Sequence, residues 1–158
     1  MRIASLNARS IYKGANKKTQ KQYITHLKSK NMAIDILCLQ ETSAFHNQEH
    51  LNENQITQFQ NTFTNKAHIL TKHCAIICLN DKYNIEDTCI TRDERSITAR
   101  IIDTQGATMC HISNIYSPAQ QKERREFFAK YYTLPQFENI TREPHLLVGD
   151  FNSSVPDS

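Results

Sequence analysis

The chain has 158 residues, enough for one domain with a buried core and too few for two comfortable ones. Hydrophobic residues make up 39% of it and charged residues 22%, a balance that excludes a disordered chain and is typical of a globular one. The net charge of +3 is far from the lopsided charge of a basic nucleic-acid-binding arm, so charge permits a polyanionic partner without requiring one.

Membrane spans and secretion signals are not expected. No stretch approaches the roughly 20 consecutive apolar residues that a membrane helix needs, and the first residues lack the apolar core of a signal peptide. The five cysteines are odd in number and lie mostly within apolar runs, which favours reduced, buried thiols over a disulfide framework. We therefore expect an intracellular protein, nuclear or cytoplasmic, with no membrane partner and no obligate protein partner.

The first part of the chain predicts a strand followed by a helix. Alternation in residues 2–8, "RIASLNA", indicates a strand, and Asn7 lies near its end. Residues 16–31 predict a basic amphipathic helix. The apolar stripe expected along this helix consists of Tyr23, Ile24 and Leu27.

The next segments predict a buried strand, a helix and two short strands. The dense apolar run 33–42, "AIDILCLQET", predicts a strand that is buried on both faces. Residues 43–66 are rich in Asn and Gln and predict a loop followed by a helix over about 51–63. Residues 67–80, "AHILTKHCAIICLN", predict two short strands with a turn between them.

The "HCAIIC" run within that segment offers His73, Cys74 and Cys78 as ligands of zinc. On a strand, however, the two cysteines share one face while His73 points away from them. No second ligand pair follows at the spacing of a zinc finger, so a zinc site is disfavoured.

The remaining segments predict a hairpin, a helix and a last strand. Residues 90–103 and 106–118 predict one strand each, with the "DTQG" stretch Asp103–Gly106 as the turn between them. Residues 119–137 predict a helix, and 143–152, "EPHLLVGDFN", the last strand. The side chains expected on the buried side of that helix are Phe127, Phe128, Tyr131 and Tyr132.

The order strand, helix, strand, several strands, helix, strand predicts sheets with helices packed outside them, an α/β or α+β sandwich. No repeat, low-complexity linker or domain boundary interrupts it. Residues 1–158 are therefore expected to form a single domain.

Four of the predicted strands end in the same way, with an apolar run followed by polar side chains. These side chains belong to Asn7, Glu41, Asn114, Tyr116, Asp150 and Asn152. Because residues i and i+2 of a strand share a face, Asp150 and Asn152 are expected to converge, and so are Asn114 and Tyr116. Gly149 would leave room for backbone or substrate to approach.

Two carboxylates, Glu41 and Asp150, together with the amides of Asn7 and Asn152 form an oxygen-rich set that suits Mg²⁺ or Mn²⁺. A metal held in this way neutralises phosphate charge and lowers the pKa of a bound water, while a phenol such as that of Tyr116 can donate to a developing oxyanion. Each residue has an alternative as a turn or cap residue. The recurrence at four strand ends favours a site.

The segments "ASLNARS", "DILCLQET", "NIYSPAQQKERREFF" and "LLVGDFNS", in this order, resemble the endonuclease/exonuclease/phosphatase superfamily. Among its members, the chain is most similar to the amino-terminal endonuclease domain of non-LTR, LINE-type retrotransposons, particularly fungal ones. The resemblance spans the whole chain. It implies a four-layer α/β/β/α sandwich of the α+β class, of which this chain would supply mainly the N-terminal half.

The resemblance also implies roles for individual residues. Glu41 matches the carboxylate that binds the catalytic Mg²⁺, with Asn7 beside it in the metal and phosphate network. Tyr116 matches the tyrosine that contacts the scissile phosphate. Asp150 matches the aspartate that positions or deprotonates the attacking water, and Asn152 matches the amide that orients this aspartate. Two further residues are candidates for substrate binding. Asn114 matches a supporting residue of its motif. Arg95 matches a residue that contacts phosphate, and its alternative is an arginine in a surface salt bridge.

The sequence departs from the family pattern in two places. Arg9 stands where relatives often carry a second Asn or Asp, and the Ser-Asp-His type motif that ends the family's second half is absent. We therefore expect a truncated domain with an exposed apolar sheet face that favours self-association.

Three functions follow from the resemblance. The first is a Mg²⁺- or Mn²⁺-dependent endonuclease that nicks DNA for retrotransposition. The second is a catalytically inactive remnant of that enzyme, and the third is a phosphatase of small phosphorylated substrates, because the shared motifs recognise the phosphate rather than its substituent.

Overall fold

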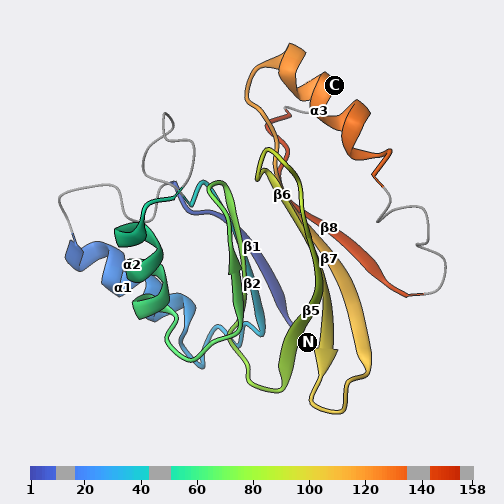
Figure 1. The fold of residues 1–158 in the computed structure, drawn as a ribbon. Helices are drawn as coiled ribbons and strands as arrows, with labels where there is room; N and C mark the ends of the chain where they lie inside the picture. Colours follow the sequence, from blue (N-terminus) through green and yellow to red (C-terminus); the bar gives the residue numbers. More distant parts are fainter. Residues whose placement is uncertain (10–16, 43–50, 135–142, 154–158) are drawn as a thin grey trace, which may run out of the picture.

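Two four-stranded sheets pack face to face in the computed structural model, which describes residues 1–9, 17–42, 51–134 and 143–153 (Figure 1). Sheet A has the strand order β1-β2-β4-β3, and sheet B has the order β5-β6-β7-β8. The strands of sheet A are β1 (Ile3–Asn7), β2 (Ile36–Gln40), β4 (Cys74–Cys78) and β3 (His68–Leu70). Those of sheet B are β5 (Tyr83–Ile90), β6 (Ser96–Asp103), β7 (Thr108–Tyr116) and β8 (His145–Asp150).

The main core lies between the two sheets. Every residue of β2 and β4 is buried, as the continuous apolar runs in the sequence predict. From sheet A, Cys38 and Ile76 pack against Ile97 and Ile112 of sheet B. Four of the five cysteines are buried, Cys38, Cys74, Cys78 and Cys110, whereas Cys89 is exposed.

Helices α1 (Lys17–Leu27) and α2 (Glu53–Thr62) cover the outer face of sheet A (Figure 1). Ile24 and Leu27 of α1 are buried in one cluster with Phe59 of α2 and with Leu37 and Leu39 of β2. Asn52 caps α2 through a reciprocal pair of hydrogen bonds with Gln55, the capping box that starts a helix firmly. The apolar stripe predicted for α1 is thus confirmed except at Tyr23, which is 40% exposed.

Helix α3 (Gln121–Tyr131) packs at one end of sheet B, on the side away from sheet A (Figure 1). Its Phe127 and Tyr131 are buried in a cluster with Ile115 of β7, and Phe151 packs against this cluster. The prediction that Tyr132 faces the core is wrong: the helix ends at Tyr131, and Tyr132 is 62% exposed.

The α+β sandwich is confirmed, with helices α1 and α2, sheet A, sheet B and helix α3 in that order (Figure 1). Strand β5 was not predicted. Residues Tyr83–Ile90 carry an acidic pair, Glu86 and Asp87, where the pairing with β6 is interrupted by a bulge. This strand forms the edge of sheet B and is mostly exposed, so its sequence lacks a buried apolar run.

The expectation of a bare apolar sheet face is wrong for the described residues. Sheets A and B are both supplied by this chain, and their inner faces cover each other. The apolar side chains that stay exposed on the edge strand β8 are Leu146 and Leu147, at 40% and 39%. Self-association stays a prediction, and this edge strand is where it would occur.

Candidate active site

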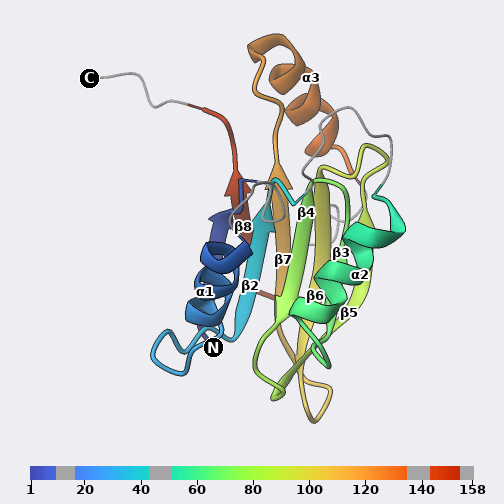
Figure 2. The same cartoon turned by 90° about the vertical axis from the view of Figure 1, so that its left-hand side faces the viewer.

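The predicted site residues lie at one end of the sandwich. Strand β1 is parallel to β2 in sheet A, and β7 is parallel to β8 in sheet B, so each pair carries its carboxyl ends to the same edge. Figure 2 shows that these four strands all end on the same side of the molecule. Asn7, Glu41, Tyr116 and Asp150, which end or directly follow these strands, therefore meet across the two sheets.

The amide of Asn7 joins the two carboxylates. Its Nδ2 donates to Glu41 Oε1 at 3.0 Å and to Asp150 Oδ2 at 2.7 Å. Because both carboxylates accept from the same Asn7 nitrogen, the carboxylates of Glu41 and Asp150 lie close together. Because the amide is neutral, it orients these carboxylates without balancing their charge.

The chain turns sharply where the strands end. Arg9, Glu41 and Asn152 all have positive φ angles, of 46°, 53° and 47°. Non-glycine residues adopt this conformation at a cost and do so mostly where the surrounding structure holds them in place. These turns therefore lie directly after β1, β2 and β8, beside the side chains of Asn7, Glu41 and Asp150.

Asn152 supports Asp150 in a different way from the one predicted. The strand ends at Asp150, so the rule that residues i and i+2 share a face does not extend to Asn152. Instead, the backbone N–H of Asn152 donates to Asp150 Oδ1 at 2.9 Å, and its side-chain Nδ2 donates to the carbonyl of Ser117 at 2.6 Å. Asp150 is thus held on one oxygen by Asn7 and on the other by the Asn152 backbone.

Tyr116 lies beside the carboxylates as a hydrogen-bond donor. Its hydroxyl donates to Glu41 Oε1 at 3.1 Å. Burial, followed by the negative charge of Glu41, raises the pKa of Tyr116 to about 12, although the nearby Arg95 acts in the opposite direction. The phenol therefore keeps its proton at neutral pH and remains a donor.

Two basic side chains pack against the Tyr116 ring. The guanidinium of Arg95 lies 5.3 Å from the ring centroid, and its Nη1 donates to the Tyr116 carbonyl at 3.3 Å. The ring of His73 lies 5.6 Å from that of Tyr116. Arg95 was predicted from the sequence, whereas His73 had been considered only as a zinc ligand.

Asn114 occupies a different place from the substrate-binding one expected. Its side chain is fully buried between the sheets, where Nδ2 donates to the carbonyls of Leu39 and Ala75 and Oδ1 accepts from Gln40 Nε2 at 2.7 Å. All of these partners belong to sheet A, so Asn114 ties β7 to the opposite sheet. It positions Tyr116, two residues further along the same strand face.

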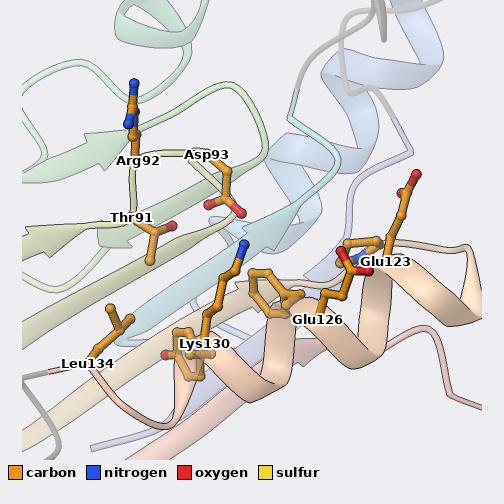
Figure 3. Close-up of a pocket in the computed structure, with 10 residues that line it drawn as sticks. Thr91, Arg92, Asp93, Glu123, Glu126, Lys130 and Leu134 are labelled. Atoms are coloured by element: carbon orange, nitrogen blue, oxygen red, sulfur yellow. The ribbon is translucent and has the colours of Figure 1, made fainter.

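A hollow of about 560 Å³ opens beside the carboxylates and is lined by Ser5, Asn7, Gln40, Gly149, Asp150 and Asn152 among others. A second, more apolar groove of about 610 Å³ lies between the 91–93 turn and α3 (Figure 3). Its rim mixes acidic and basic side chains, and Lys130 points from α3 toward Asp93. Of the convergent polar groups, Asn7, Asp150 and Asn152 line the first hollow, and Glu41 contacts Asn7 beside it, so this is the candidate active site.

The residues at the first hollow could hold a hydrated divalent cation. Within the part of the chain that the structure describes, no group of three or more His, Cys, Asp or Glu residues gathers that could hold a metal ion. Glu41 offers one carboxylate as a ligand, with Asn7 and the Asp150 carboxylate beside it. Mg²⁺ is usually bound by one or two carboxylates while it keeps several waters, and Glu41 meets that requirement without Asp150.

Solved structures with the same arrangement of elements are known. TDP2 from D. rerio, solved with a single-stranded DNA product, superposes with a TM-score of 0.67 at 12% identity, over 97% of this chain and 61% of that one. A mannosyl-6-phosphatase from Bacteroides thetaiotaomicron gives 0.65 at 17% identity, over 95% and 64%. An endonuclease/exonuclease/phosphatase family protein of that organism gives 0.63 at 16% identity, over 95% and 61%.

The chain has the endonuclease/exonuclease/phosphatase fold. It spans less than two thirds of the length of each of these three structures. No protein-family model and no curated protein sequence matches it. None of the helices among the described residues is long and apolar enough to cross a membrane.

Proposed function

We propose that the protein is a divalent-metal-dependent phosphodiesterase that nicks DNA. The observation that carries this proposal is the single amide of Asn7 in contact with both Glu41 and Asp150, beside the Tyr116 hydroxyl. Two neighbouring carboxylates together with a phenol that keeps its proton suit a cation and a phosphate oxygen. This combination is what phosphoester hydrolysis requires.

Each side chain has a role in this reaction. Glu41 and Asn7 would hold Mg²⁺ or Mn²⁺, which when bound neutralises phosphate charge and lowers the pKa of water. Asp150, held on both oxygens, accepts a proton from the water that attacks phosphorus. Tyr116 turns its O–H from Glu41 to a phosphate oxygen, and Arg95, packed against the Tyr116 ring, adds a positive charge next to this phosphate. The attack forms one phosphorus–oxygen bond and breaks the bond to the leaving oxygen, which takes up a proton from solvent water.

DNA as the substrate has its own support. The TDP2 structure that this fold resembles was solved with a single-stranded DNA product. The sequence motifs resemble the endonuclease domains of LINE-type retrotransposons, and for this reason we propose a retrotransposon origin. A phosphatase of small phosphorylated substrates is the second candidate, favoured by the mannosyl-6-phosphatase with the same fold.

The test is the nicking of supercoiled plasmid DNA in the presence of Mg²⁺. We expect the unmodified chain to nick the plasmid, EDTA to stop it, and Asp150→Asn to lower the rate at least about 100-fold. Asp81→Asn is the matched control, since Asp81 is an exposed partner of Lys66 on the surface. Equal nicking by the two variants would remove Asp150 from the mechanism.

Two other outcomes lead to the alternatives. No nicking by any form, with the fold intact by circular dichroism, would favour an inactive remnant. Release of inorganic phosphate from a sugar phosphate, without nicking, would favour the phosphatase.

A further inference from the structure

We propose that His73 is a phosphate-contacting residue, which together with Arg95 holds a phosphate of the substrate strand adjacent to the one that is cleaved. This inference deepens the proposed function and rests on it. It adds a residue to the site and specifies the substrate as a chain with at least two consecutive phosphates rather than a terminal phosphate ester.

The segment that carries His73 is fixed to the site by Thr71, whose side chain is buried. The Thr71 hydroxyl donates to the carbonyl of Glu94 at 2.8 Å, and it accepts from the backbone N–H of Cys74 at 3.0 Å. The hydroxyl of Thr42, the residue after Glu41, donates to the Thr71 carbonyl at 3.0 Å. The loop is therefore bound to the end of β2, to the start of β4 and to the residue before Arg95.

The strand order places His73 and Arg95 on one side of the carboxylates. In sheet A, β4 lies on the side of β2 that is opposite to β1, and in sheet B, β6 lies on the side of β7 opposite to β8. His73 precedes β4 and Arg95 precedes β6. Along the edge, the polar groups therefore run from Asn7 and Asp150, through Glu41 and Tyr116, to His73 and Arg95.

Charge changes along the same line. Asp150 and, next along the line, Glu41 carry the carboxylates that suit a cation, whereas the other end carries Arg95 and His73. Of the charged groups near His73, Lys72 adds a further cation, and the Glu94 carboxylate accepts from the Lys72 backbone N–H at 3.1 Å. Neighbouring strands of a sheet are about 4.8 Å apart. His73 and Arg95 therefore lie about one strand spacing from Glu41 and Tyr116.

A single-stranded nucleic acid places phosphates at regular short intervals along such an edge. With one phosphate at Tyr116 and Glu41, the next would meet the guanidinium of Arg95 and a ring N–H of His73. A phosphate monoester of a sugar has no second phosphate and would leave this pair unused.

The test measures binding without catalysis. A fluorescein-labelled single-stranded DNA of about 12 nucleotides is titrated with the full chain in EDTA at several salt concentrations. We expect His73→Phe to weaken binding about threefold to tenfold, because the hydrogen bond from a ring N–H to a phosphate oxygen is lost. His73→Lys should restore the affinity.

His26→Phe is the matched control, since His26 is an exposed histidine in the last turn of α1, on the outer side of sheet A. Binding by His73→Phe within twofold of the unmodified chain, or an equal loss in His26→Phe, would overturn the proposal. If His73→Phe is unfolded by circular dichroism, His73→Gln decides by the same criteria. If the unmodified chain nicks no DNA but the His73 variant binds more weakly than it does, the phosphate contact is supported and the proposed catalysis is refuted. If the unmodified chain nicks DNA and the His73 variant binds equally well, only the role of His73 is refuted.

Discussion

Replacing Gly149 by alanine tests whether the close approach of β8 to β7 sets the position of Asp150. A Cβ at residue 149 would lie 2.0 Å from the carbonyl oxygen of Ile115 and 2.8 Å from its carbonyl carbon. Real Cβ atoms essentially never come within 3.0 Å of such an atom, so β8 must retreat from β7 by about 1 Å next to Asp150. We expect a shift of this size to break the 2.7 Å contact between Asp150 and Asn7.

The cost has two parts. Forcing a methyl group against the backbone of the neighbouring strand costs about 1–3 kcal/mol, and placing alanine at a φ of +143° costs about 1–3 kcal/mol more. We therefore expect Gly149→Ala to lower the free energy of unfolding by about 2–6 kcal/mol, a large share of a typical total of about 5–15 kcal/mol.

Gly106→Ala separates the two parts. Gly106 also has a positive φ, +82°, but an added Cβ there would meet nothing within 4 Å. Urea unfolding followed by circular dichroism should show a clearly larger loss for Gly149→Ala than for Gly106→Ala. Equal losses would refute the claim that contact with β7, rather than backbone conformation, requires glycine before Asp150.

Three more predictions concern the core and the edge of sheet B. Asn114→Ala should lower the free energy of unfolding by about 2–4 kcal/mol, because it leaves buried partners in sheet A unsatisfied; a loss below about 1 kcal/mol in urea unfolding would contradict this. Burial raises the pKa of the Cys38 and Cys78 thiols to about 12, so titration with an aromatic disulfide should find one reactive thiol in the folded chain, at Cys89, and five in denaturant. Burial, together with His111, lowers the pKa of His145 below its usual 6.5. As the pH falls below about 6.5, the unfolded chain therefore binds a proton at His145 more readily than the folded chain does, and the free energy of unfolding decreases. His145→Gln should lose less free energy of unfolding between pH 7 and pH 5 than the unmodified chain. Parallel curves of the free energy of unfolding against pH would contradict the assignment of this loss to His145.

Strands with buried apolar runs could be predicted from the sequence, whereas elements defined by their place in the fold could not. The run in β2 has no plausible place outside a core, so its burial follows from the hydrophobic effect alone. Strand β5 is held by pairing with β6 and exposes most of its side chains, so its acidic and polar sequence resembles that of a loop. Backbone pairing of this kind leaves little trace in side-chain pattern.

The site shows the same limit. The convergence of four side chains could be predicted, because strands that end at the same end of a sandwich bring their last residues together whatever their order in the chain. These side chains are those of Asn7, Glu41, Tyr116 and Asp150. The contact between His73 and Tyr116 depends on the order of strands in both sheets, which the sequence does not specify.

Divalent-cation binding to the Asn7–Glu41–Asp150 group tests the central claim most directly. Calorimetric titration of the full chain with Mn²⁺ should detect a site that Glu41→Gln abolishes, because this change removes one of the two carboxylates that the Asn7 amide holds together. Glu53→Gln, at an exposed position in the first turn of α2, should bind Mn²⁺ like the unmodified chain. Identical titration curves for the unmodified chain and Glu41→Gln would contradict the account.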